Sequence, residues 1–243
     1  MAARETRQVS TAEGDGTRTT DRYDRDSVEF SRAIAFFDAA YAFALTLLVV
    51  NIDPPPAADW ANPVRWVTSG LGWQLFGFAV SFAVIAVFWR VNHRIGSEFT
   101  GFTSRTITAN IVSLGLIVLI PFSTQGISDP ATADEPLAVA VYAVNISLAV
   151  VAQSTIYLVA RGDGLLRHPL PRRADTVTLI DTMSTPAVFL LSIPIAYVWG
   201  AEWGRWFWML LIVVGPISGR WAARRVARIV SEERSAPPPT RAS

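Results

Sequence analysis

The sequence predicts an all-α bundle of six transmembrane helices. Of its 243 residues, 51% are apolar and only 17% are charged, and nine Trp and thirteen Phe are among them. This composition is too apolar for an ordinary soluble domain. The apolar residues form runs of about twenty, the length a helix needs to cross a bilayer while satisfying its own backbone hydrogen bonds.

Short polar loops rich in Pro and Asp separate the runs, so we expect a single membrane domain over residues 28–230. The polar segments 1–27 and 231–243 predict disordered tails. Gly215 and Pro216 interrupt the last run, and prolines inside membrane helices are expected to bend them. The predicted spans are residues 33–52, 71–92, 106–125, 137–160, 177–199 and 204–223, with kinks at Pro121, Pro186, Pro194 and Pro216.

The basic residues predict how the bundle is oriented. All 21 are Arg, and they cluster between the apolar runs, which indicates orientation in a bilayer rather than binding of nucleic acid. The predicted spans place 19 of them on the side of both termini and two, Arg65 and Arg205, on the other side. Because positively charged segments stay inside, both termini are expected in the cytoplasm.

The sequence offers no catalytic or metal-binding set. It contains no Cys and only two His, which excludes disulfides and thiolate chemistry and is too few for a His-rich metal centre. No Ser/His/Asp order, HExxH or glycine-rich phosphate loop is present. Only two acids lie deep in the spans, Asp38 and Asp181, whereas catalysis needs convergent groups. We therefore expect neither an enzyme nor a cofactor, and we expect Asp181 to cap or pair locally.

The first span carries its acid and its large apolar residues on different sides. The run RAIAFFDAAYAFALTLLVVNI begins at Arg32. At 100° per residue, Asp38 lies about 140° from Phe43 and about 180° from Leu47, and Thr46 lies at the border of the apolar stripe. Asp38 therefore faces away from that stripe. The stripe consists of Phe36, Ala40, Phe43, Leu47 and Val50.

A charged residue inside a span is costly and nearly always meets a partner in the protein interior. Asp38 lies roughly 9 Å along the helix from Arg32, level with the inner ends of the second and third spans. There FWRVNHRIG supplies Trp89 and His93 on one face, and SRTITAN supplies Asn110. We expect these five residues to form a buried polar cluster that holds three spans in register, rather than an ion-binding or proton-relay site.

Three motifs resemble those of one protein family. RAIAFFDAAYAFALTLL resembles the RxxxFSDAVFAIAxTLL signature of the transmembrane protein 175 family. SFAVIAVFWRVNH is similar to that family's SFxxIxxxWxxH pattern, and NIVSLGLIVLIPFST resembles its Leu-rich run ending in PF. The motifs follow the family's order and spacing over about the first half of the chain. The chain departs from the signature at Phe37, where the family has Ser, and at Phe43, where it usually has Ile or Leu.

The resemblance implies a homotetrameric potassium channel with four copies of the first span around a central pore. Its pore-lining positions carry over to Phe43, Thr46, Leu47 and Val50. No TVGYG-like filter loop is present, so apolar rings would gate by dewetting, and selectivity for potassium over sodium should be modest. The implied partners are further copies of the chain, membrane lipids, potassium and, to a lesser degree, sodium.

The function expected from these observations is a passive, weakly selective potassium channel of the bacterial inner membrane. Two other classes stay open. A secondary transporter would use broken helices around a midplane site, for which the Pro-rich fifth span is suited, although no inverted halves are visible. A non-conducting structural or regulatory membrane protein is the third class.

Overall fold

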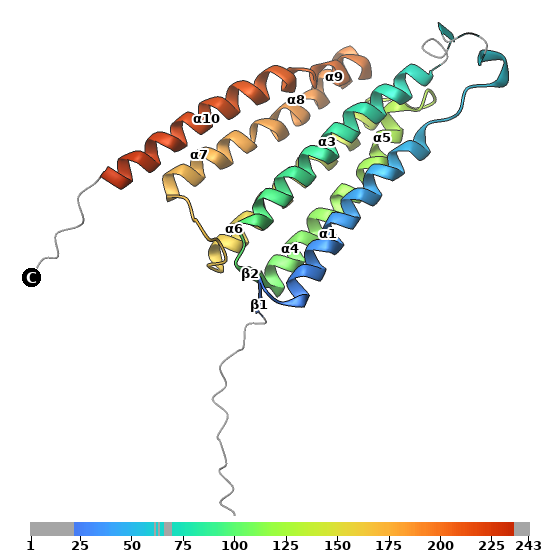
Figure 1. The fold of residues 1–243 in the computed structure, drawn as a ribbon. Coiled ribbons are helices and arrows are strands. Elements are labelled where there is room, and N and C mark those ends of the chain that lie inside the picture. Colours follow the sequence, from blue (N-terminus) through green and yellow to red (C-terminus); the bar gives the residue numbers. More distant parts are fainter. Residues whose placement is uncertain (1–21, 61, 63, 66–69, 236–243) are drawn as a thin grey trace, which may run out of the picture.

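The computed structural model describes residues 22–60, 62, 64, 65 and 70–235 (Figure 1). Within this part of the chain, six helical segments are long and apolar enough to cross a membrane, so the predicted all-α class and the number of spans are confirmed. The segments lie roughly alongside one another, with the first and the last at opposite edges (Figure 1). Their bounds are Val28–Asn51, Leu71–Ser97, Ser104–Ser128, Pro136–Gly162, Arg172–Trp199 and Ala201–Ser235.

The first span consists of α1 (Val28–Leu47) and a 3₁₀ turn, η1 (Leu48–Asn51). Ser27 caps the helix, because its hydroxyl accepts a hydrogen bond from the backbone N–H of Phe30 at 3.2 Å. At the other end, Asn51 Nδ2 donates to the carbonyl of Pro121 at 2.6 Å. Both ends of the span are therefore fixed by hydrogen bonds. A second 3₁₀ turn, η2 (Ala57–Asp59), lies in the following loop.

A short antiparallel ribbon, absent from the all-α prediction, holds the chain before α1. Strand β1 (Arg22–Asp24) pairs with β2 (Gly101–Thr103), so part of the segment predicted as a disordered tail is ordered. Gly101 permits the close approach, because a Cβ atom there would lie 2.5 Å from the Tyr23 carbonyl oxygen. Residues 1–21 lie outside the described part. A three-residue strand is too short to give a clear alternating pattern in the sequence.

The second and third spans follow the prediction closely. The second is a single helix, α3 (Leu71–Ser97). The third divides at Leu119 into α4 (Ser104–Val118) and α5 (Ile120–Ser128). Pro121 lies in the first turn of α5, where its missing N–H costs little, so the helix breaks beside the expected proline.

Helix α6 (Pro136–Gly162) lies at the centre and contacts α4, α5 and α8. The fifth span divides into α7 (Arg172–Thr182) and α8 (Ser184–Trp199), with Met183 between them and Pro186 in the first turn of α8. Pro194 lies inside α8. The central position of α6 accounts for the high share of small and aliphatic residues in its sequence, because neighbours approach it from several sides.

The last span breaks at a different place from the predicted one. It divides into α9 (Ala201–Phe207) and α10 (Leu210–Ser235), and α10 continues through Gly215 and Pro216. The break follows from a tertiary contact: Trp208 stacks on Tyr142 with ring centroids 4.9 Å apart, and its Nε1 donates to Ser192 Oγ at 2.8 Å. α10 also extends past the predicted end of the domain at residue 230, and residues 236–243 lie outside the described part.

Candidate functional site

The first span has two different faces. Its inner face is packed into the bundle, and Phe37 there is only 2% exposed. Its outer face is turned away from the bundle, and Phe43 and Val50 keep 60% and 73% of their surface exposed. The buried residues are Phe30, Phe37, Tyr41, Ala44 and Leu48. A long apolar face that its own chain does not cover needs lipid or another protein surface against it.

The predicted pore-lining residues all lie toward this outer face. Phe43, Thr46 and Val50 are exposed, and Leu47 is half-buried. The Thr46 hydroxyl donates its hydrogen to the carbonyl of Phe43 at 2.8 Å. Because the donor is used within the helix, the hydroxyl oxygen presents its lone pairs outward. The face therefore combines large apolar side chains with one hydrogen-bond acceptor.

Asp38 points the other way, toward α3, as its helical position predicted. The indole Nε1 of Trp89 donates to Asp38 Oδ1 at 2.9 Å, which joins α1 to α3. The ring of His93 lies 5.6 Å from that of Trp89, one turn further along α3. The structure thus brings together three residues of the predicted cluster, Asp38, Trp89 and His93. The cluster is not buried as predicted, because Asp38 is half-buried and both aromatic rings are exposed at the surface of the described structure.

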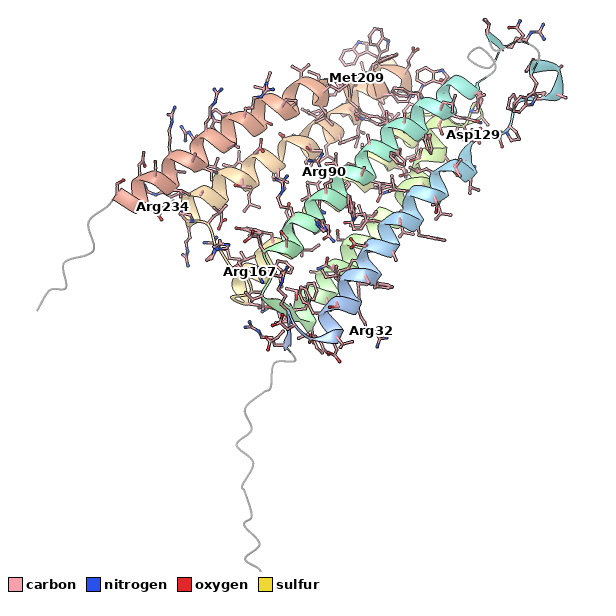
Figure 2. The ribbon with its side chains drawn as sticks, in the orientation of Figure 1. Arg32, Arg90, Asp129, Arg167, Met209 and Arg234 are labelled. Carbon is pink, nitrogen blue, oxygen red and sulfur yellow. The ribbon has the colours of Figure 1, made fainter. Side chains whose placement is uncertain are left out.

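The other two residues of the predicted cluster lie apart from these three. Arg32 is exposed at the start of α1 and points away from the bundle (Figure 2), and within the described residues it has no ion pair. Asn110 is buried, but its Nδ2 donates to the carbonyl of Thr106, one turn back on α4, at 3.0 Å. Asn side chains often form hydrogen bonds with nearby backbone groups of their own helix. Because the Asn110 amide is already bonded in this way, it does not require Asp38 as an acceptor.

Phe37, the departure from the family's Ser, belongs to an aromatic cluster that the sequence analysis did not find. Its ring makes an edge contact with Phe102 at 5.8 Å, and Phe102 in turn stacks on Phe30 at 4.6 Å. Phe99 completes the cluster at 5.6 Å from Phe102. The large side chain is therefore accommodated by rings from the segment between α3 and α4. The close spacing of Phe99 and Phe102 in a loop was the available signal.

A second feature that the sequence analysis missed lies at the far end of the first span. The backbone N–H of Asp53 donates to Gln74 Oε1 at 2.9 Å, and Gln74 Nε2 donates to the Asp53 carboxylate at 3.1 Å. Gln74 is buried in α3, so this pair of bonds fixes the chain three residues after Val50. An acidic side chain is thereby held beside the end of the exposed face.

A cleft opens on the opposite side of α3. It has a volume of about 770 Å³ and is lined mainly by apolar side chains of α3, α6, α8 and α10. Asp181, expected to cap or pair locally, lies in its wall, and within the described structure its Oδ1 is buried with no hydrogen-bond partner. The expected local pairing is therefore not found for this oxygen.

The polar atoms around α1 are bonded to one another rather than gathered around a metal centre. In the part of the chain that the structure describes, no three His, Cys, Asp or Glu side chains lie together in a way that would hold a metal ion. What the outer face offers instead is apolar surface and the Thr46 oxygen. Such a surface suits lipid, another copy of α1 or a partly hydrated ion.

Comparison with known proteins finds one matching family model and similar potassium channels. Residues 32–121, which cover α1 to the start of α5, match the family model described as endosomal/lysosomal potassium channel TMEM175. The chain is 26% identical over 174 residues to a potassium channel of Streptomyces collinus, a match that covers 70% of this chain and 84% of that one. It is 28% identical to a potassium channel of Chamaesiphon minutus, covering 70% and 85%.

The fold also matches a solved structure. The crystal structure of a lysosomal potassium-selective channel TMEM175 homolog from Chamaesiphon minutus superimposes with a TM-score of 0.63 and 23% sequence identity. The match covers 79% of this chain and 99% of that one. At this identity the likeness concerns the fold, and it extends beyond the segment that the family model matches.

Proposed function

We propose that the chain is a member of the transmembrane protein 175 family, whose model matches residues 32–121, and that it is a multi-pass membrane protein that acts as a passive potassium channel. Its relatives from Streptomyces collinus and Chamaesiphon minutus are both described as potassium channels. The observation that carries the proposal is the exposed apolar face of α1, which lies inside the segment that matches the family model. A helix that leaves its bulkiest residues uncovered requires a partner surface.

The partner surface that we propose is the same face of three further copies. Four first spans around one axis would bring the outer faces together and line a pore with Phe43, Thr46, Leu47 and Val50. This homotetramer is supported by the two-faced character of α1: packing inside the protomer uses only the opposite face. A closed ring of four copies repeats one contact between neighbours, so the same face of every copy points toward the central axis.

The proposed constriction consists of apolar rings at Phe43, Leu47 and Val50. Rings of this kind gate by dewetting, because a narrow apolar passage does not hold a continuous column of water. The outward lone pairs of Thr46 would replace part of an ion's hydration shell between two rings. One hydroxyl layer discriminates poorly between potassium and sodium, so the proposed selectivity is weak.

We place this channel in the inner membrane of a bacterium with both termini in the cytoplasm. The distribution of Arg supports this orientation, with 19 of 21 on the side of the termini.

The second class that the sequence left open, a secondary transporter, gains one supporting observation from the unpaired Asp181 oxygen in the cleft. Flux that saturates with ion concentration and couples to a second solute would favour that class.

The experiment that tests the proposal is ion flux from liposomes holding the purified full chain, under a potassium gradient and then a sodium gradient. Phe43→Ala should raise the flux of both ions several-fold, because it removes the largest ring from the constriction. Wild type should pass potassium faster than sodium.

A matched control is available because the same change can be made elsewhere. Leu47→Ala should raise flux, whereas Leu191→Ala, an equal truncation of an exposed residue on α8, should leave it unchanged. If neither wild type nor Phe43→Ala passes ions while both stay tetrameric, the proposed channel function is wrong.

A further inference from the structure

One face of α10 carries four arginines around a tryptophan. Arg220, Arg224 and Arg228 follow one another at intervals of four residues, so they form a row along the helix. The guanidinium carbon of Arg225 lies 5.3 Å from the centre of the Trp221 ring. Together with Ile217, these residues line a surface hollow of about 520 Å³. We call this set, Arg220, Trp221, Arg224, Arg225 and Arg228, the arginine face.

The charges of the arginine face are not neutralised within the described part of the chain. None of its four arginines forms an ion pair there, whereas Arg161 pairs with Asp175 and Arg105 with Asp163. Figure 2 shows α10 at the edge of the bundle, between the labelled Met209 and Arg234. The face is therefore open to an outside partner of negative charge.

The same side of α10 is apolar on the approach to the arginines. At 100° per residue, Leu210, Val213 and Ile217 lie within about 100° of the row of arginines, and all three are exposed. One continuous stripe therefore changes from apolar to basic along the helix, with Trp221 at the change. This order of side chains matches the order of chemical layers in a bilayer.

The position along the helix at which the stripe changes from apolar to basic residues agrees with the position of a membrane surface. About nineteen residues separate the start of the sixth span at Ala201 from Arg220. They reach at most roughly 28 Å along a helix axis, because the span breaks between α9 and α10. The hydrocarbon core of a bilayer is about 30 Å thick. If the span begins at one surface, Arg220 and Arg224 reach the headgroup layer at the other, on the side of both termini.

We propose that the arginine face binds the phosphate of an anionic phospholipid whose acyl chains lie along Leu210, Val213 and Ile217. Guanidinium groups match phosphate in geometry and charge, and several Arg directly beyond a span favour anionic lipids. The apolar stripe favours a lipid over a soluble anion, because only a lipid contacts both the arginine face and the apolar residues beside it. The site lies at the opposite edge from α1 (Figure 1), so it does not depend on the proposed pore.

The test counts bound lipids by native mass spectrometry on the full chain, purified in detergent and given equal amounts of phosphatidylglycerol and phosphatidylcholine. Wild type should carry several-fold more phosphatidylglycerol than phosphatidylcholine. The triple variant R220Q/R224Q/R228Q should bring that ratio close to one, because each lost arginine weakens the attraction to an anionic headgroup.

The matched control is R167Q/R172Q/R173Q, which removes the same charge from exposed arginines before and at the start of α7 and should keep the wild-type ratio. If the triple change lowers the yield of folded protein, R224Q alone should lower the ratio by about twofold or more. A wild-type ratio near one, or an equal loss in both triple variants, would overturn the proposal. Displacement of the lipid by inorganic phosphate alone would assign the face to a soluble anion and overturn it as well.

Discussion

The two faces of the first span meet different demands although the same 24 residues form both. The inner face holds an aromatic cluster around Phe37 and a hydrogen bond from Trp89 to Asp38, and its contacts lie within the protomer. The outer face holds Phe43 and Val50, which remain exposed. The inner face determines how this chain folds, and the outer face is left exposed for the proposed assembly and passage of ions. Substitutions on the two faces should therefore separate stability from flux.

The largest effect is expected at the centre of the inner face. Phe37→Ala removes a buried ring from contact with Phe102 and should lower the free energy of unfolding by about 3–5 kcal/mol, because lost packing and a residual cavity both contribute. Thermal unfolding of the purified protein measures the effect.

The neighbouring Phe36 is the control for this prediction. Its side chain is 60% exposed on the outer side, so Phe36→Ala should change the free energy of unfolding by less than about 0.5 kcal/mol. Equal losses from the two variants would show that the faces are not energetically distinct in the way their burial indicates.

A smaller loss of stability is expected from the link between α1 and α3. Asp38→Ala leaves the partly exposed Trp89 indole N–H without its acceptor and should lower the free energy of unfolding by about 0.5–1.5 kcal/mol, with less of the proposed tetramer recovered. Asp38→Asn keeps an oxygen that accepts the bond and should lose less. Full recovery of tetramers with a changed preference between potassium and sodium would instead assign Asp38 to ion selection.

The smallest effect is expected on the outer face at Thr46. Thr46→Val keeps the shape but removes the oxygen that faces outward, and should lower potassium flux a few-fold, corresponding to about 1 kcal/mol, without lowering the melting temperature. Thr108→Val on α4 is the matched control, because that exposed hydroxyl is also bonded within its own helix. Equal flux changes in both variants would contradict a pore role for Thr46.

The sequence alone predicted what depends on composition and helical period. Runs of about twenty apolar residues indicated six spans, and the described part of the chain contains six. The spacing of Asp38 relative to Phe43 and Leu47 indicated which side of α1 would face α3, and Trp89 is found there. These features follow from one helix at a time, so no knowledge of the tertiary structure was needed.

The features that sequence reasoning missed depend on contacts between distant residues. Gly215 and Pro216 indicated a break, but the break occurs at Trp208 because that ring is held by Tyr142 and Ser192. The paired bonds between Asp53 and Gln74 join residues across a loop, and no local pattern marks them. Asn110 lies at a depth that would allow contact with Asp38, but its side-chain amide donates to a backbone carbonyl of its own helix instead.

The hydrogen bonds at the two ends of the first span limit how α1 can move. One end is tied to β2 through β1, and the other to α3 and α5 through Asp53 and Asn51. A piston-like displacement along the helix axis would break bonds at both ends, and a twist about the axis would break the bond between Asp38 and Trp89. Rotation of the Phe43 and Leu47 side chains breaks none of these bonds. Widening of the proposed pore is thus least costly as a change of rotamers on a stationary helix.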